Sequence, residues 1–237
     1  VMKLDTGTEL PEKFVLTKEF KNTYDLINKT DTNLFITGKA GSGKSTLLEY
    51  FRQNTNKNFA TLAFQGITAI KAKGQTIHSF FKLGPHFLSK DDVKELRDKQ
   101  VIQNLDTILI DEISMVRADL FDAIDLSLKK NRKNDKPFGG VQMVLFGDVM
   151  QIDPIVGSDD EVMEKFYPNG PFFFNSKSYS KKDFKQIELT KIFRQSDKKF
   201  VNLLNKIRMN KLQNEDLSIL NNQLINREEV PKDTIIL

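Results

Sequence analysis

Eight residues early in the chain have the types and the spacing of a phosphate cradle. They read Gly-Lys-Ala-Gly-Ser-Gly-Lys-Ser at positions 38–45 and follow the apolar run 34–36. Glycines let backbone N–H groups face a polyphosphate, the lysine at position 44 can reach the outer phosphates, and the Ser45 hydroxyl suits Mg²⁺. The run therefore predicts a P-loop that binds ATP and Mg²⁺, against the alternative of a chance Gly/Ser/Lys turn. The residues expected to contact the nucleotide are Gly38, Ala40, Gly41, Ser42, Gly43, Lys44, Ser45 and Thr46.

Two adjacent carboxylates follow a second apolar run. Residues 108–110 read Ile-Leu-Ile, and Asp111 and Glu112 come next. At a strand end beside a P-loop, Asp111 suits Mg²⁺ held through its water shell, and Glu112 suits the base that orients and deprotonates the attacking water. The alternative is plain surface charge, for which Asp-Glu pairs are common. The position of this pair favours the catalytic role, so we expect Ser45 and Asp111 at the metal and Glu112 at the water.

An amide follows a third apolar run. Residues 144–146 lead into Gly-Asp-Val-Met-Gln at positions 147–151. A strand-end loop of this kind would place Gln151 near the γ-phosphate, where its amide could sense hydrolysis. The alternative is a Gly-Asp turn with Gln151 merely exposed. The order of the three motifs along the chain favours the sensor.

Short apolar runs alternate with longer stretches of helical character, which predicts an α/β fold: a mainly parallel sheet with helices on both faces. Strands are expected at residues 33–37, 60–64, 107–110, 143–146 and 185–189. Helices are expected at residues 19–29, 43–54, 67–72, 117–130, 198–209 and 216–225. Residues 83–104 form the longest stretch without a clear element, and residues 89–96 within it suit one short capped helix.

Composition narrows the class of protein. The 237 residues include 39% hydrophobic types and 19 Phe, enough for a sizeable core, and the formal net charge of +4 permits an anionic partner without requiring one. The absence of cysteine excludes disulfides and thiolate metal sites. No apolar run approaches the roughly 20 residues that cross a bilayer. We therefore expect an intracellular protein, cytoplasmic or nucleoid-associated, with no membrane partner, and a solvated loop rather than a nucleic-acid contact at the basic run 129–136.

Five motifs in order resemble the first motor domain of the Pif family of superfamily-one DNA helicases, which is related to RecD. After the P-loop come Gly-Gln-Thr-Ile-His-Ser-Phe-Phe at 74–81, Asp-Glu-Ile-Ser-Met at 111–115, Gly-Asp-Val-Met-Gln-Ile at 147–152 and Leu-Thr-Lys-Ile-Phe-Arg-Gln at 189–195. The resemblance covers residues 14–225, and the segment 74–81 is its most family-specific part. It implies a RecA-like P-loop fold and an ATP-hydrolysing helicase that moves 5′ to 3′ on single-stranded DNA. It also connects the chain with DNA repair and telomere maintenance, and the sequence does not distinguish between these two biological roles.

Catalytic residues carry over from the resemblance position by position. It implies that Lys44, Glu112, Gln151 and Arg194 act in catalysis. Arg194 would reach ATP near the junction of two domains, as a bidentate phosphate ligand does. For Arg194 the alternative is a surface ion pair.

The resemblance also implies a track for single-stranded DNA. The residues along it would be Gly66, Thr68, His78 and Ser79. Phe80 and Phe81, which follow them, are expected in the core rather than as a platform for bases. Residues 63–66 read Ala-Phe-Gln-Gly where the family has Ala-Pro-Thr-Gly, so an amide would replace a threonine as donor to the phosphate.

Domain organisation follows from the same resemblance. Residues 1–195 would form the N-terminal RecA-like motor domain, with residues 83–104 as a small insertion that could hold a strand-separating wedge. Residues 196–237 would be a helical connector and the start of a second motor domain. Because motors of this type close ATP between two RecA-like domains and take an arginine finger from the second, the chain as given should bind ATP but hydrolyse it slowly. We expect a monomer, completed in the intact protein by a second RecA-like domain.

Two other functions stay open. A non-helicase P-loop ATPase, such as a small-molecule kinase or an AAA-type remodeller, would not bind single-stranded DNA. A non-catalytic, motor-like module would form a stable complex with a polypeptide that supplies the missing motifs.

Overall fold

The computed structural model describes residues 10, 16–39, 41–191 and 198–222. The chain divides into two compact units, Val1–Arg194 and Gln195–Leu237. The first unit carries the sheet and the phosphate loop, and the described part of the second, residues 198–222, carries two helices.

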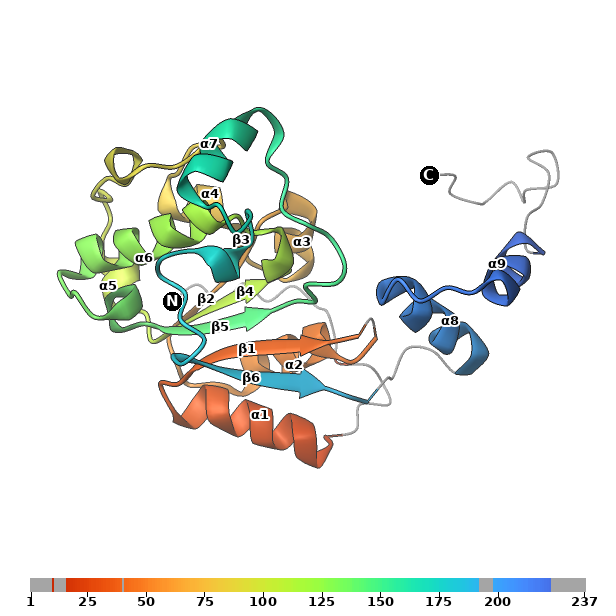
Figure 1. Cartoon of the computed structure of the whole chain (residues 1–237). Coiled ribbons are helices and arrows are strands. Elements are labelled where there is room, and N and C mark those ends of the chain that lie inside the picture. Colours follow the sequence, from red (N-terminus) through yellow and green to blue (C-terminus); the bar gives the residue numbers. More distant parts are fainter. Residues whose placement is uncertain (1–9, 11–15, 40, 192–197, 223–237) are drawn as a thin grey trace, which may run out of the picture. The chain divides into compact units, whose positions relative to one another are not determined.

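One parallel sheet organises the first unit. Within the described residues, six strands lie in the order β3-β2-β4-β5-β1-β6, and every neighbouring pair is parallel (Figure 1). The α/β fold expected from the sequence is confirmed, and its five strands are present within one residue at each end. The sixth, of two residues, was missed because so short a segment shows no period. The strands are β1 (Asn33–Gly38), β2 (Phe59–Ala63), β3 (Gln75–Thr76), β4 (Thr107–Asp111), β5 (Gln142–Phe146) and β6 (Phe184–Leu189).

The six expected helices are also present, with shifted ends. The longest begins one residue later than expected and continues two residues further, and the last was expected to reach residue 225, which lies outside the described residues. Three additional helices have at most seven residues, too few to show a helical period. The helices are α1 (Lys18–Lys29), α2 (Lys44–Asn54), α3 (Gly66–Lys71), α4 (Ile77–Phe81), α5 (Gln100–Gln103), α6 (Ala118–Arg132), α7 (Asp160–Phe166), α8 (Lys198–Arg208) and α9 (Asn214–Asn221).

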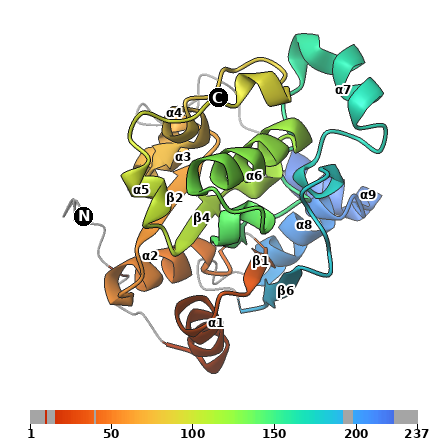
Figure 2. The ribbon, with the colours of Figure 1, turned by 90° about the vertical axis from the view of Figure 1, so that its left-hand side faces the viewer.

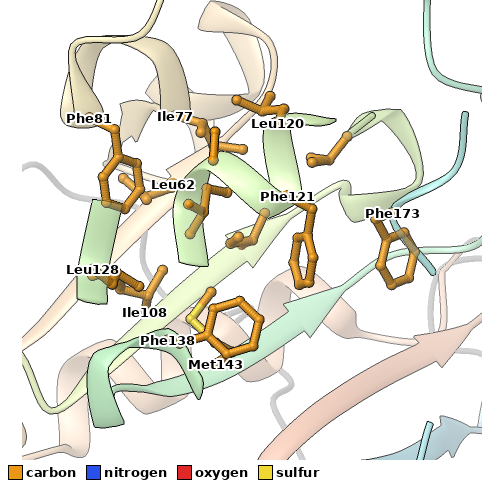
Figure 3. Close-up of a cluster of buried hydrophobic side chains, with 14 of the residues drawn as sticks. Leu62, Ile77, Phe81, Ile108, Leu120, Phe121, Leu128, Phe138, Met143 and Phe173 are labelled. Atoms are coloured by element: carbon orange, nitrogen blue, oxygen red, sulfur yellow. The ribbon is translucent and has the colours of Figure 1, made fainter. Parts of the chain in front are cut away.

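Side chains of the central strands feed two separate cores, one on each face of the sheet. In β1, Leu34 and Ile36 pack with α1 and α2, whereas Phe35 packs on the opposite side with α4 and α6. Figures 1 and 2 show these helices on the two faces, and Figure 3 shows the larger core beneath α6. Because both faces are covered, the central strands β1, β4 and β5 are buried along nearly their whole length rather than at alternate residues.

The insertion at residues 83–104 is packed onto α6. Its expected helix at 89–96 is only a three-residue 3-10 turn, Lys90–Asp92, capped reciprocally by Ser89 and Asp92, because the chain becomes extended at Val93. The Val93 side chain is 1% exposed and belongs to the larger core. Buried contacts therefore hold this segment against the domain.

The basic run 129–136 is the end of α6 followed by a loop in which Lys133 and Lys136 are exposed, as expected, but two of its cations contact the insertion. Lys130 Nζ donates to the carbonyl of Val93 at 2.9 Å, and Arg132 donates to the carbonyls of Ile102, Gln103 and Leu105 at 2.6–3.0 Å. These cations satisfy backbone acceptors of the insertion, so they tie it to the end of α6.

In the described part of the second unit, an ion pair joins α8 to α9. Lys206 of α8 binds the Asp216 carboxylate of α9 at 2.7 Å. Asp216 also accepts the backbone N–H of Gln213 at 2.9 Å, which closes a capping box at the start of α9.

Candidate active site

Three strands deliver the predicted motifs to one edge of the sheet. Ile36 pairs with Phe146, and Ile110 pairs with Leu145. Since all three strands are parallel, the segments that follow β1, β4 and β5 emerge together at the carboxyl edge, where ligands of open α/β sheets bind. The phosphate loop, the carboxylate pair and the amide loop are therefore neighbours.

The loop after β1 has the backbone of a phosphate cradle. Gly41 and Gly43 have positive φ angles of 77° and 89°, which glycine adopts at little cost, and Gly43 is the N-cap of α2. A Cβ on Gly38 would lie 2.5 Å from Ser42 Oγ. Lys44 Nζ donates to the Gly38 carbonyl at 2.6 Å, so the ammonium lies over the loop.

An unsatisfied buried hydroxyl in this loop fits a polar ligand. Ser42 is 1% exposed, and its Oγ has no hydrogen-bond partner among the residues described. Ser45 is exposed and Thr46 half-buried, both in the first turn of α2, whereas Ala40 lies outside the described residues. The positive end of the α2 dipole adds to the attraction for an anion.

Asp111 is the buried member of the carboxylate pair. It is 8% exposed, and burial, followed by the charge of Glu112, raises its pKa to about 6. The backbone N–H of Glu112, which donates to Asp111 Oδ1 at 3.0 Å, and the Lys44 ammonium oppose that rise. Glu112 has a φ of 50°, a left-handed conformation uncommon for a residue with a side chain, and there the chain leaves β4.

The predicted sensor Gln151 has a partner that the sequence did not reveal. Gln151 is exposed, and its Nε2 donates to Asp148 Oδ2 at 3.2 Å. Asp148 is completely buried and also accepts the Met150 N–H at 3.1 Å. Asp148 therefore positions the Gln151 amide. The sequence could have indicated this role, because Asp148 lies in the Gly-Asp turn just before the amide.

The donor set suits Mg²⁺ held by few protein ligands. Among the described residues, no group of three or more His, Cys, Asp or Glu side chains could hold a metal ion. Mg²⁺ in phosphate sites takes one or two protein oxygens and completes its shell with water and phosphate. The Ser45 hydroxyl and the buried Asp111 carboxylate provide such oxygens.

Residues expected along a DNA track follow β2 and β3 at the same edge. Gly66 and Ser79 are exposed, and Thr68 and His78 are half-buried. The His78 ring packs edge-on against Phe64 with 5.6 Å between centroids. Burial, followed by the positive charge of Arg117, lowers the pKa of His78, so the ring is neutral at pH 7.

Three further residues complete the account of the sequence predictions. Phe81 is 2% exposed within the core, as expected, and Phe80 packs partly buried against the same cluster. Arg194 lies outside the described residues.

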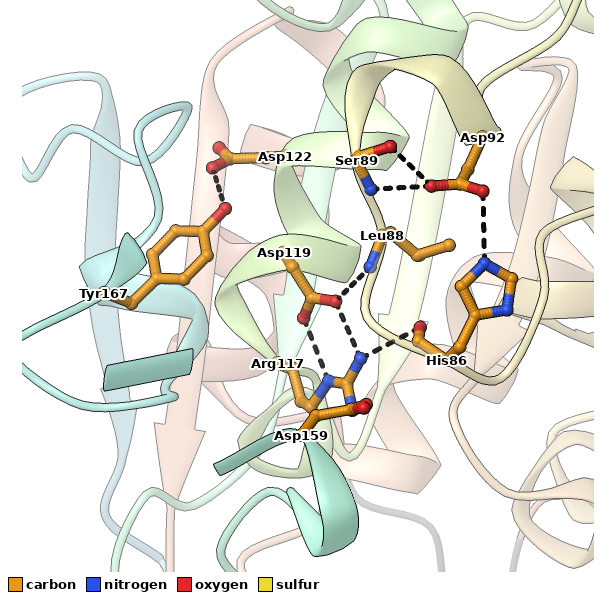
Figure 4. A network of polar contacts seen from close by, with 9 residues as sticks. All are labelled: His86, Leu88, Ser89, Asp92, Arg117, Asp119, Asp122, Asp159 and Tyr167. Carbon is orange, nitrogen blue, oxygen red and sulfur yellow. Dashed lines mark hydrogen bonds and ion pairs between the residues drawn. The ribbon is translucent and has the colours of Figure 1, made fainter. Parts of the chain in front are cut away.

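A buried guanidinium joins three segments near His78, and nothing in the sequence singled it out. Arg117 is 7% exposed and donates to both oxygens of Asp119 at 2.9 and 2.7 Å, to Asp159 at 2.9 Å and to the carbonyl of His86 at 3.1 Å (Figure 4). Asp119 also accepts the N–H of Leu88 at 2.8 Å. The start of α6, the insertion and the segment after the sensor loop are therefore fastened together.

Comparison with known protein families agrees with the phosphate loop and the carboxylate pair at this site. The family model of the PIF1-like helicases matches residues 15–218. The chain belongs to the PIF1-like helicase family. Among its relatives, the ATP-dependent DNA helicase RRM3 of Saccharomyces cerevisiae is 36% identical over 208 residues, 84% of this chain and 28% of RRM3. The human ATP-dependent DNA helicase PIF1 is 32% identical over 188 residues, 77% of this chain and 28% of that protein.

Solved structures of PIF1-like helicases share the fold of this chain. Bacteroides Pif1 in complex with ADP-AlF3 and single-stranded DNA matches with a TM-score of 0.85 and 37% identity, over 93% of this chain and 52% of that one. Bacteroides Pif1 bound to single-stranded DNA matches with a TM-score of 0.81 and 39% identity, over 89% and 50%. The PIF1-like chain described here thus spans about half of these solved chains. In the described part of the chain, no helix is both long and apolar enough to span a bilayer.

Proposed function

We propose that this chain is the N-terminal motor half of an ATP-dependent DNA helicase that moves 5′ to 3′ on single-stranded DNA. The observation that carries the proposal is the meeting of three segments at the carboxyl edge of the sheet: the P-loop, Asp111–Glu112 and Asp148–Gln151. Residues 1–195 form the motor domain, and residues 196–237 the connector and the start of a second RecA-like domain. The protein acts as a monomer.

Each residue of the site has one task in this proposal. The loop from Gly38 to Ser45 and the Lys44 ammonium bind the phosphates of ATP. Glu112 takes the proton of the attacking water, and Asp148 holds the Gln151 amide toward the γ-phosphate. Ser45 and Asp111 would hold Mg²⁺, which, when bound, neutralises phosphate charge. Arg194 completes the phosphate contacts.

The DNA track consists of Gly66, Thr68, His78 and Ser79, at the ends of β2 and β3. Because His78 is neutral, it contacts the sugar-phosphate backbone through a hydrogen bond rather than through an ion pair. Contacts to the backbone carry no sequence information, so we expect little sequence preference and an affinity that falls with salt.

The first test measures binding of a fluorescent ATP analogue and of single-stranded DNA to the chain. Lys44→Ala should weaken nucleotide binding about 10-fold or more, because the phosphates lose a direct cationic partner. Lys94→Ala, which removes the same charge from an exposed position in the insertion, should leave nucleotide binding unchanged. Equal nucleotide affinity of Lys44→Ala and the unmodified chain would contradict the phosphate site. Absence of DNA binding would contradict the helicase and favour another P-loop ATPase.

A further inference from the structure

A cavity lies beside the proposed DNA track. Its volume is about 410 Å³, and it opens between the end of β2, α4, the insertion, the start of α6 and the segment after the sensor loop. The side chains that matter for its chemistry are those of Phe64, His78, Pro85, Leu88, Arg117 and Asp159.

Most of the wall is apolar or aromatic. The rings of Phe64 and His78 lie edge to face at an interplanar angle of 66°. Pro85 and the buried Leu88 of the insertion add apolar surface. A wall of this kind favours a flat group that can leave water.

The cavity is unsuited to a phosphate, although it contains an arginine. A guanidinium has five N–H donors, and four of those of Arg117 are used by Asp119, Asp159 and the His86 carbonyl. The two carboxylates outnumber the single guanidinium, and burial lowers the pKa of His78 so that its ring carries no charge at pH 7. An anion entering here would meet no free cationic fork and would be repelled by the carboxylates, whereas a neutral planar group brings no charge for them to repel.

The proposed backbone contacts lie next to this wall. Gly66 is two residues from Phe64, a span of at most about 7 Å, and Ser79 directly follows His78. Gly66 and Ser79 are exposed. A sugar-phosphate held at these positions therefore has its own base within reach of the cavity.

We propose that the cavity receives one unstacked nucleobase of the bound single strand, with Phe64 and His78 as its aromatic wall. This inference rests on the proposed DNA-binding function. Stacking on an aromatic side chain is tolerant of base identity, so the site adds affinity without reading sequence.

The test compares two oligonucleotides of about eight nucleotides, one complete and one a fully abasic sugar-phosphate chain of the same charge, across a series of salt concentrations. The chain should bind the complete strand about 5- to 100-fold more tightly at every salt concentration. Phe64→Leu should reduce this ratio to near one. The matched control Phe174→Leu, at a 40% exposed phenylalanine outside the cavity, should preserve the ratio.

Equal affinities for the two strands would overturn the base site while leaving a phosphate-binding track intact. Failure of both strands to bind would overturn the proposed function and the base site together. A second measurement needs no protein variant and is unaffected if Phe64→Leu fails to fold: one abasic position is moved along the complete strand. One position should weaken binding at least 5-fold more than the others, and equal losses at all positions would overturn the base site.

Discussion

Asp111 is the residue whose chemistry the fold changes most. Its burial opposes the ionised form, and the adjacent Glu112 charge opposes it further, so the pKa of Asp111 rises from 3.8 to about 6. In the absence of a cation, the buried Asp111 carboxylate therefore lowers the free energy of unfolding of the domain. A bound cation would remove this destabilisation, which makes Asp111 a strong oxygen ligand for a metal ion.

Asp111→Asn should stabilise the metal-free protein at pH 8. Because the folded pKa of Asp111 lies above its unfolded value, the native state holds the proton more tightly, and the wild-type free energy of unfolding falls as pH rises through about 6. The amide carries no charge, so the variant should gain about 3 kcal/mol over wild type at pH 8, and the difference should vanish below about pH 4. Urea unfolding in EDTA at several pH values measures this.

The matched control for that experiment is Asp91→Asn, at an exposed aspartate of the insertion. It should show no such step in stability. A difference between Asp111→Asn and wild type that is the same at pH 4 and pH 8 would show that the buried charge is not its cause.

At the scale of elements, a single buried ion-pair network joins parts of the first unit that the chain order separates. Arg117 stands at the start of α6, its partner Asp159 lies 42 residues further on, and the insertion reaches the network through Leu88. Asp119 has a fully buried side chain and Asp159 one that is 21% exposed. The two halves of the network should therefore differ in energy.

Arg117→Ala should be strongly destabilising. It leaves the Asp119 charge buried without its partner, which costs about 3–5 kcal/mol, whereas Asp159→Asn keeps an acceptor for the guanidinium and should cost about 1 kcal/mol. Urea unfolding measures both values. The control Asp153→Asn, at an exposed loop position, should stay within about 0.5 kcal/mol of wild type. A small loss for Arg117→Ala, equal to that of Asp159→Asn, would contradict a buried network.

At the scale of the whole molecule, this chain spans about half the length of the solved relatives that it matches. The phosphate loop and the Asp111–Glu112 carboxylate pair lie within one unit of 194 residues, and the solved relatives are about twice as long as the matched region. A single site edge can bind ATP, but an arginine finger from a second domain is worth about 10³–10⁵ in rate.

Adding the second motor half should therefore raise ATP turnover about 1,000-fold or more and make it dependent on single-stranded DNA. Phosphate release, measured for the 237-residue chain and for the extended protein with and without DNA, checks this. Glu112→Gln in the extended protein should remove the gain, because the attacking water loses its base. Rapid turnover by the shorter chain alone, indifferent to DNA, would contradict a half-motor.

Much of this protein was readable from local sequence. The P-loop glycines, the carboxylates after β4 and the amide after β5 were predicted because each follows a short apolar run, and parallel strands bring such ends to one edge. The bounds of the five predicted strands were accurate to one residue, because each strand coincides with a short apolar run. The two-residue β3 and the short α4 were not predicted, since neither is long enough to show a period.

The tertiary structure alone decided which side chains act on one another across the chain. The sequence singled out Gln151 but not Asp148, the buried carboxylate that accepts its hydrogen bond. It also did not indicate that Arg117 would be buried and paired with a residue 42 positions away. It also assigned the basic run 129–136 to solvent, whereas Lys130 and Arg132 bind backbone carbonyls of the insertion. Periodicity and glycine spacing report on backbone conformation within a few residues, while burial, pKa and ion pairing depend on neighbours that only the folded chain brings into contact.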